Sequence, residues 1–172
     1  MRPSSASYRI RVYRPADLPR LQQITADTFE GVSIDRNMER RLGPFGPGDW
    51  KSRKTAAIAD NCRNQPDGVF VAETEAGEVV GYVTTSLNPH SGIGVIPNLA
   101  VDPAHQGHGL GRALLEHALA FFRERGMAVA KIETLEQNPI GQHLYPSLGF
   151  QEVARQIHFA MRLDDGPGRT GR

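Results

Sequence analysis

The stretch from Asn98 to Arg112, NLAVDPAHQGHGLGR, decides the fold of this chain, because an apolar strand runs through a glycine-rich turn directly into a helix. Glycines let successive backbone N–H groups turn toward one point, and the start of the helix adds unpaired donors and the positive end of its dipole. Such a junction binds phosphates. The loop does not end in the Gly-Lys-Ser/Thr of a nucleotide-triphosphate loop. The spacing of Gly107, Gly109 and Gly111 is also one residue shorter than the dinucleotide pattern G-x-G-x-x-G.

The same loop resembles the acetyl-coenzyme-A signature of the Gcn5-related N-acetyltransferases, the GNAT superfamily. Its pattern Gln106-x-x-Gly109-x-Gly111 matches the family's Gln/Arg-x-x-Gly-x-Gly/Ala, and Val101-x-Pro103 precedes it. The resemblance implies that the predicted phosphate site holds the pyrophosphate of coenzyme A.

A second block lies downstream, from Asn138 to Phe150, with the sequence NPIGQHLYPSLGF. It is similar to the family's other block, which has Asn, then Ala three residues later, then Leu-Tyr and Leu-Gly-Phe. Gly141 replaces the usual Ala, and Pro146 follows the tyrosine where Glu is common; neither change removes a reactive group. The two blocks stand in the family's order, separated by one helix and one strand, and the resemblance covers residues 8–163.

Length and composition predict a single domain over residues 1–172, with a core at 8–163 and a flexible polar tail at 164–172. The amino-terminal residues lack the apolar segment of a secretory signal, and no apolar run is long enough to span a membrane. A cytoplasmic location without a membrane partner is therefore expected. The formal net charge of +1 lacks the basic excess typical of nucleic-acid-binding proteins, so no nucleic-acid partner is expected.

Cysteine and histidine usage argues against a metal centre. Cys62 is the only cysteine, which excludes an internal disulfide and a cysteine-based metal site, and the six histidines show no ligand spacing. A basic stretch interrupted by acids and glycines is interpreted as a solvated face. Its members are Arg36, Arg40, Arg41, Lys51, Arg53 and Lys54.

Hydrophobic periodicity predicts a mixed α/β fold of alternating strands and helices. The expected strands are 8–13, 68–73, 79–86, 93–101, 129–135, 150–156 and 158–163, and the expected helices are 15–29, 50–64, 110–125 and 139–148. Pro97 cannot donate a hydrogen bond inside its strand, so a bulge or a local splitting of the sheet is expected there. The GNAT resemblance implies a mostly antiparallel sheet of six to seven strands, flanked by about four helices and opened into a V at the bulge.

The resemblance also assigns the coenzyme site. Backbone groups of the strand would hold the pantetheine arm, and backbone amides of the loop would hold the pyrophosphate. The residues implied are Leu99, Ala100, Val101, Gln106, Gly107, His108, Gly109, Leu110, Gly111 and Arg112, together with Asn138 and Tyr145. Asn138 would bond the arm and would also suit the N-cap of the helix that starts at Pro139.

Amide formation from a thioester needs a neutral amine and a proton for the departing thiolate, and most of the rate comes from placing the reactants. Tyr145 matches the family's usual general acid. Glu133 lies five residues before Asn138, as does a glutamate in related enzymes that acetylate protein amino termini, and it is the expected base. His90 and a water oriented by Asn98 are the alternatives.

The acceptor is the least specified part of the prediction. Phe29, Glu30 and Asn98 are candidate acceptor-binding residues. The candidate acceptors are a small polyamine or amino-acid derivative, an aminoglycoside-like antibiotic, and the amino terminus of a protein. The predicted function is transfer of an acetyl group from acetyl-coenzyme A to a primary amine. A catalytically silent acyl-coenzyme-A sensor is the alternative, and a dinucleotide-dependent oxidoreductase would need the missing glycine spacing. Relatives imply a possible homodimer through the terminal strands.

Overall fold

The computed structural model describes residues 7–163, so the expected tail and the amino-terminal residues tested for a secretory signal lie outside it. Its centre is a five-stranded sheet with the order β1-β2-β3-β4-β5. The strands are β1 (Tyr8–Val12), β2 (Phe70–Thr74), β3 (Val79–Asn88), β4 (Ile93–Val101) and β5 (Val129–Ile132). The first four are antiparallel neighbours, whereas β5 runs parallel to β4. Residues 102–128, which include the glycine loop, form the crossover connection between these two parallel strands.

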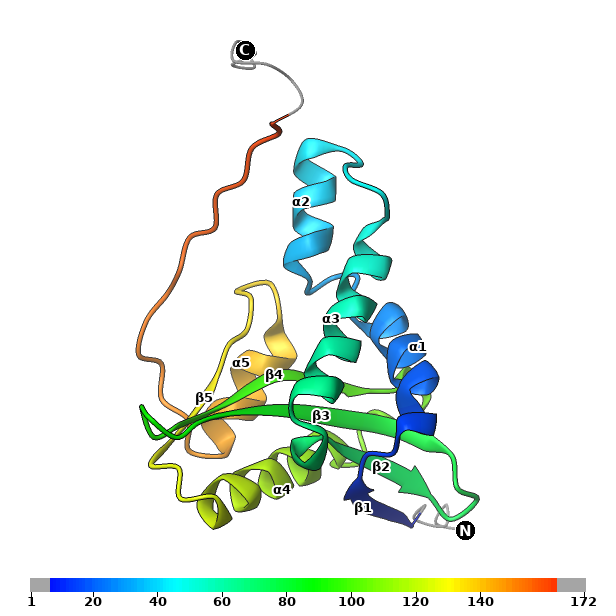
Figure 1. Cartoon of the computed structure of the whole chain (residues 1–172), viewed down its shortest axis with the longest axis vertical. Helices are drawn as coiled ribbons and strands as arrows, with labels where there is room; N and C mark the ends of the chain where they lie inside the picture. Colours follow the sequence, from blue (N-terminus) through cyan, green and yellow to red (C-terminus); the bar gives the residue numbers. More distant parts are fainter. Residues whose placement is uncertain (1–6, 164–172) are drawn as a thin grey trace.

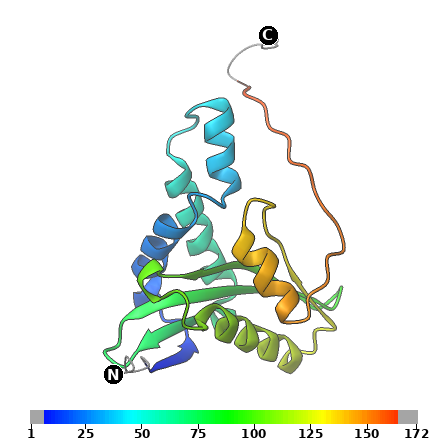
Figure 2. The same ribbon diagram turned by 180° about the vertical axis from the view of Figure 1, so that it is seen from behind.

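The helices form a layer on each face of the sheet (Figures 1 and 2). They are α1 (Leu18–Thr28), α2 (Ile34–Leu42), α3 (Trp50–Asn64), α4 (Leu110–Glu124) and α5 (Pro139–Ser147). Short 3-10 turns stand at Pro15–Asp17, Pro66–Gly68 and Pro103–His105. α1 and α3 cover one face, and α4 and α5 cover the other.

Each layer follows from an apolar stripe. α4 buries Leu110, Leu114, Leu115, Ala118, Phe121 and Phe122 against the sheet, at the spacing of one helix face. Leu21, Ile24, Ile58 and Cys62 from α1 and α3 pack on the opposite face around Tyr82. α3 begins where Asp49 accepts a hydrogen bond from the Ser52 N–H at 2.8 Å, a standard N-cap.

The bulge predicted at Pro97 is present. The β3–β4 register passes from Thr84 opposite Asn98 to Ser86 opposite Val95, so β4 carries one extra residue at this point. Beyond the bulge the two sides of β4 differ. β5 pairs only with residues 93–96, so residues 98–101 pair with β3 alone among the described residues. The sheet therefore opens next to the glycine loop and leaves one edge of β4 free.

The predicted final strand pair is wrong. Residues 150–163 are extended but pair with no described strand, so the sheet has five strands instead of six to seven. The segment stands away from β5 (Figure 1) and exposes the apolar side chains of its period-2 pattern. These are Val153 (92%), Ile157 (81%), Phe159 (92%), Met161 (76%) and Leu163 (84%). The alternation of apolar and polar residues identifies a segment that is suited to form a strand. It does not identify the sheet edge with which that strand would pair.

α2 is a helix that the sequence prediction omitted, which brings the α-helices to five. Its apolar residues Ile34, Met38 and Leu42 recur at helical spacing but are only half-buried, and the sequence prediction did not use this short stripe. It begins after an N-cap serine, Ser33, and ends at Gly43, where φ is +76°. α2 contacts α3 and projects beyond the sheet as an arm (Figure 1).

Candidate active site

The glycine loop between β4 and α4 has the geometry of an anion site. Gly107 and Gly109 have φ of +80° and +78°, and Gly109 is the N-cap of α4 without a side-chain cap. The first N–H groups of α4 are therefore left for a ligand. Nothing lies within 4 Å of a β-carbon built on either glycine, so backbone conformation and not space requires glycine there. At Gly111 a β-carbon would lie 3.4 Å from Leu144 Cδ2, where α4 passes close to α5.

Asp102 anchors the start of this loop. Its Oδ1 accepts from the Ala104 N–H at 2.8 Å, and its Oδ2 lies 2.5 Å from Arg20 Nη2 on α1. Arg20 Nε also donates to the Val79 carbonyl at 2.9 Å. Burial acts to raise the pKa of Asp102, but the hydrogen bonds from Ala104 and Arg20 outweigh it and hold that pKa below its usual value. Through Arg20, the Asp102 carboxylate connects the loop to α1 and to Val79 of β3.

The predicted coenzyme residues of β4 turn their side chains into the protein. Leu99 packs toward α4, and Ala100 is buried on the opposite face. The backbone edge is thus what β4 presents at its opening. Val101 contributes a carbonyl, which accepts a hydrogen bond from Gln106 Nε2 at 3.0 Å. In the first turn of α4, the Arg112 guanidinium donates to Ser147 Oγ at 2.7 Å and so ties α4 to the end of α5.

Asn138 caps α5, as one of the two predicted roles requires. Its Oδ1 accepts from the Gly141 N–H at 3.3 Å, and its Nδ2 donates to Thr134 Oγ1 at 2.9 Å. A β-carbon on Gly141 would lie 2.8 Å from Thr134 Oγ1 and 3.0 Å from Tyr145 Cε2. The close approach of these side chains explains why glycine stands where the family usually has alanine.

Tyr145 lies one turn further along α5, with its ring partly buried in the core cluster on the α4 face. Its ring meets Phe150 edge to face, with centroids 6.1 Å apart. Burial raises the pKa of Tyr145, so the phenol stays protonated at neutral pH. None of the residues in the described part of the chain hydrogen-bonds its hydroxyl, which leaves that proton available.

The two side chains considered as the base lie in different places. Glu133 follows the last residue of β5, leads the loop to Asn138, and is 65% exposed with an ion pair to Lys131 at 2.6 Å. His90 is exposed in the turn before β4. Five residues of strand, about 16 Å at the usual rise, separate Ile93 from Asn98. Ile132 pairs with Ile96, so Glu133 lies beside the bulge of β4, whereas His90 lies before the opposite end of that strand.

Lys54, which the sequence prediction placed on a solvated face, contacts both Asn98 and Phe29. Lys54 Nζ donates to Asn98 Oδ1 at 2.7 Å and lies 4.5 Å from the centroid of the Phe29 ring. Asn98 is buried, and its Nδ2 donates to Asn61 Oδ1 at 2.7 Å and to Thr84 Oγ1 at 3.0 Å. Both amide N–H groups of Asn98 are thus occupied, and only a lone pair of Oδ1 remains for a water.

The basic stretch is not uniformly a solvated face. Lys54 belongs to the inner face of α3, with Trp50 and Ile58 at i−4 and i+4, and this helical spacing is the signal that could have identified it. Arg53 is also held inside, bonded to Glu39 Oε1 at 2.6 Å and stacked on Phe45. Glu30 is exposed and lies 3.5 Å from Arg36.

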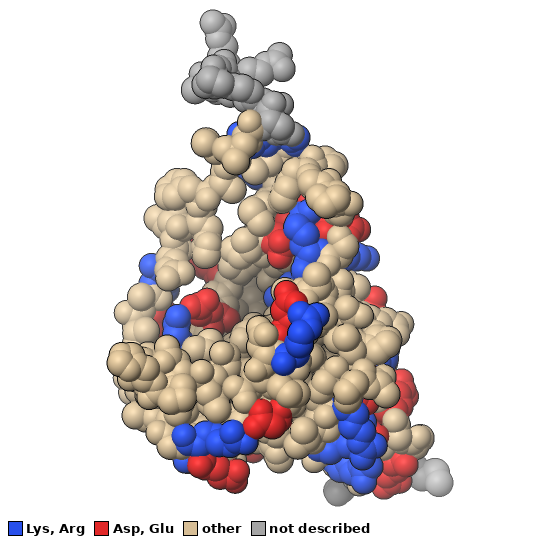
Figure 3. Space-filling model, viewed as in Figure 1, with Lys and Arg blue, Asp and Glu red and all other residues tan. Residues whose placement is uncertain are grey.

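The arm formed by α2 is tied to the loop after β5. Gln137 Nε2 donates to the Gly31 carbonyl at 2.7 Å and to Asn37 Oδ1 at 3.1 Å, and Asn37 Nδ2 donates back to Gln137 Oε1 at 3.0 Å. Figure 1 shows this loop rising beneath α2, and Figure 3 shows a hollow between the carboxyl-terminal segment and the helical arm. Charged side chains of both signs lie around that hollow.

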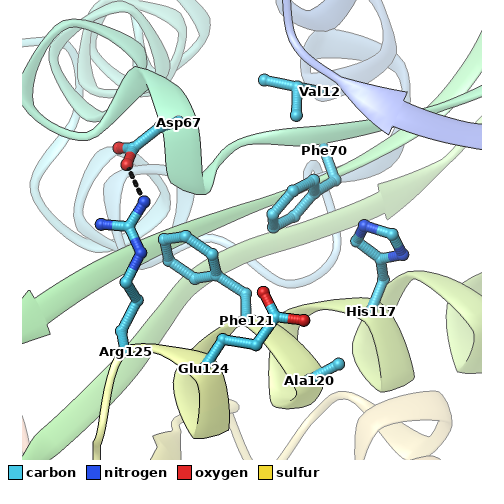
Figure 4. A pocket seen from close by; sticks show the side chains of 8 residues that line it. All are labelled: Val12, Asp67, Phe70, His117, Ala120, Phe121, Glu124 and Arg125. Carbon is cyan, nitrogen blue, oxygen red and sulfur yellow. Dashed lines mark hydrogen bonds and ion pairs between the residues drawn. The ribbon is translucent and has the colours of Figure 1, made fainter.

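A cavity of about 380 Å³ lies elsewhere, between the carboxyl-terminal half of α4 and the strands β1 and β2 (Figure 4). Phe70, Phe121 and His117 form its apolar wall, and Arg125 pairs with Asp67 across it. It contains neither the glycine loop nor the Asn138 block. Within residues 7–163, no three His, Cys, Asp or Glu side chains gather as a metal site, and no helix is long and apolar enough to cross a membrane.

The profile of the Acetyltransferase (GNAT) family matches residues 34–150. The chain belongs to this family. Streptothricin acetyltransferase of Streptomyces lavendulae is 35% identical over 161 residues, which cover 84% of this chain and 82% of that protein. Mycothiol acetyltransferase of Rhodococcus jostii (strain RHA1) is 28% identical over 159 residues, 84% of this chain and 52% of that protein. The chain thus spans about half the length of the first curated relatives it matches.

The fold comparison agrees. The yncA protein of Salmonella typhimurium, solved with its cofactor acetyl-CoA, is 26% identical with a TM-score of 0.64, covering 87% of this chain and 82% of that one. The family predicted from the two sequence blocks and the mixed α/β fold predicted from periodicity are therefore confirmed, and GNAT acetyltransferases use the predicted donor, acetyl-CoA. For a GNAT acetyltransferase, the free edge of β4 and the uncapped start of α4 are the groups that fit an extended amide chain followed by a pyrophosphate.

Proposed function

We propose that this chain transfers the acetyl group of acetyl-CoA directly to a primary amine within a ternary complex. The observation that carries the proposal is the free edge of β4 at residues 98–101, which leads directly into the uncapped glycine start of α4. This arrangement supports one ligand that is extended at one end and anionic at the other. The amine would reach the thioester at the opening of the sheet.

In the reaction, the amine nitrogen attacks the thioester carbon, the C–S bond breaks, and an amide and a thiolate result. The nitrogen loses one proton and the thiolate gains one. Tyr145 is proposed to give the thiolate its proton, because its hydroxyl is protonated at neutral pH and has no partner among the described residues. Asn138 and Gly141 position the helix that carries Tyr145.

Glu133 is proposed to accept the amine proton, directly or through one water. Its support is its place at the head of the loop that ends at Asn138, with a carboxylate turned to solvent and not locked in the core. Backbone placement by β4 and the glycine loop supplies most of the rate, since oriented reactants reach effective molarities of roughly 10⁵ M or more.

A screen of primary amines with acetyl-CoA, read out as release of free thiol, tests the proposal. The panel includes polyamines, amino acids, aminoglycosides, streptothricin-type antibiotics and peptides with free amino termini. Amine-dependent thiol release with the mass of an acetylated product supports the proposal. Tight acetyl-CoA binding without turnover of any amine would assign the chain to the alternative, an acyl-CoA sensor.

We also propose that two copies of this chain associate through the segment 150–163. Five apolar side chains of this segment are exposed, and β5 ends the sheet with a free outer edge on which Val129 is 56% exposed. In one copy the segment is held away from that edge, because Arg162 donates to the Leu42 and Pro44 carbonyls at the arm. The extended segment of each copy thus pairs as an added strand with the β5 edge of the other copy.

A further inference from the structure

Lys54 is a half-buried ammonium group without a carboxylate partner. Among residues 7–163, no Asp or Glu oxygen lies within 4.0 Å of its Nζ, whereas its neighbour Arg53 has both Glu39 and Asp35. One of the three N–H donors of Lys54 goes to Asn98 Oδ1, and the Phe29 ring covers another side. At least one donor is left for a ligand.

Keeping this ammonium group charged in a half-buried position is energetically unfavourable. Moving a charge out of water is unfavourable unless an opposite charge and hydrogen bonds compensate. Burial lowers the pKa of Lys54, and the more distant charge of Asp35 offsets that shift only in part. A ligand carboxylate would supply the missing partner.

The position of this charge limits what it can contact. Asn98 is the first residue of β4 past the bulge, where β5 no longer pairs, and Phe29 stands between α1 and the arm. Under the proposed function, the acceptor must approach this same opening to reach the thioester. Lys54 and Phe29 therefore lie on the acceptor side of β4, with a cation beside an apolar ring.

We propose that Lys54 binds the carboxylate of the acceptor, so that the substrate is a small amino-acid-like molecule carrying an amine and a carboxylate. This inference rests on the proposed function and adds the acceptor class to it. A single ammonium balances a single negative charge. A phosphate is recognised better by the fork of an arginine, and the arginine next to Lys54 in the sequence, Arg53, is already paired with carboxylates.

The test compares matched acceptors on matched variants. Leucine, methionine and phenylalanine are each paired with their carboxamides, and kcat/KM from thiol release is measured for wild type, Lys54→Gln and Lys54→Arg. The quantity compared is the acid-to-amide ratio of each variant, because dividing one ratio by another cancels the difference in amine pKa within a pair. The ratio is expected to fall at least tenfold in Lys54→Gln and less in Lys54→Arg, which keeps the charge.

A binding measurement separates this inference from the proposed function. In the presence of CoA, N-acetylleucine should bind wild type more tightly than N-acetylleucinamide does, and Lys54→Gln should remove the difference. Equal ratios in wild type and Lys54→Gln, or turnover confined to amines without a carboxylate, would overturn the inference while acetyl transfer stands. If no amine is acetylated, the proposed function fails, and the binding comparison still decides whether Lys54 recognises a carboxylate.

Discussion

The side-chain amide of Gln137 forms a reciprocal pair with that of Asn37, which lies 100 residues earlier, through hydrogen bonds of 3.0 and 3.1 Å. Together with the bond from Gln137 to the Gly31 carbonyl, this pair joins the α2 arm to the loop that carries Asn138. Because α2 buries none of its own residues, its position depends on such polar contacts. These hydrogen bonds thus tie the α2 arm to the loop that precedes α5.

Gln137→Ala removes all three of these hydrogen bonds and should loosen the arm without unfolding the core. Hydrogen exchange is expected to accelerate across residues 31–42 and to stay unchanged in α4, with a loss of roughly 1–2 kcal/mol or less in the free energy of unfolding. Gln156→Ala, an exposed glutamine in the extended segment, is the matched control. Unchanged exchange in residues 31–42 would show that other contacts hold the arm.

Gly109→Asp should abolish acetyl-CoA binding measured by calorimetry. The substitution places a carboxylate where the phosphates are expected and forces a side chain into φ of +78°, a strain of about 1–2 kcal/mol. Gly77→Asp is the matched control, because Gly77 has φ of +83°, has nothing within 4 Å of its built β-carbon, and lies in the distant β2–β3 turn. Full affinity in folded Gly109→Asp, or equal losses in the two variants, would contradict the coenzyme assignment.

Tyr145→Phe deletes a hydroxyl that no described residue hydrogen-bonds, so the fold and acetyl-CoA affinity should persist while turnover falls by roughly 10²–10⁴-fold. Tyr82→Phe provides the contrast, because the buried Tyr82 hydroxyl lies 2.6 Å from Thr25 Oγ1. That variant should lose about 1 kcal/mol of stability with turnover intact.

A second donor refines the assignment of Tyr145. If Tyr145 protonates the thiolate, an acetyl thioester with a more acidic thiol should lose less rate in Tyr145→Phe than acetyl-CoA does. Equal losses would assign Tyr145 to positioning, and wild-type turnover would remove any catalytic role.

The predicted start of a helix agrees with the structure where residues of that helix and its immediate neighbours determine it. The apolar stripe of α4 and the glycine before Leu110 place its start correctly, and α3 begins at Trp50 as predicted. The loop geometry was also predictable, because positive φ at Gly107 and Gly109 is what alternate glycines permit. These features depend on residues close together in the chain.

Most of the features that were missed depend on partners distant in the chain. α2 is the exception, because its stripe of Ile34, Met38 and Leu42 is present in the sequence but is short and only half-buried. The strand pattern of residues 150–163 is present, but whether it pairs depends on an edge that another element, or another copy, must supply. Lys54 lies on a helix face like an ordinary surface lysine until Asn98 and Phe29, from two other elements, come within reach of it.

Glu133→Gln should lower kcat without changing acetyl-CoA affinity. A base must be deprotonated to act, so the wild-type rate should fall at low pH, and the variant should lose or shift this acidic limb of the pH–rate profile. Glu136→Gln is the control, since Glu136 is also exposed and, like Glu133, forms an ion pair, in its case with Arg155. An unchanged limb in Glu133→Gln would transfer the role to an ordered water at the opening of β4.

Ile157→Lys combined with Phe159→Lys should convert the protein from a dimer to a monomer. Both side chains lie on the apolar face of the extended segment, 81% and 92% exposed in one copy, and burial against a second copy would make charges there unfavourable. Gln156→Lys with His158→Lys adds the same charge on the opposite face of the segment and should leave the dimer intact. Light scattering coupled to size-exclusion chromatography measures the mass. A monomeric wild type at tens of micromolar, or a dimer that survives the charges on the apolar face, would show that this segment is covered by something other than a second copy.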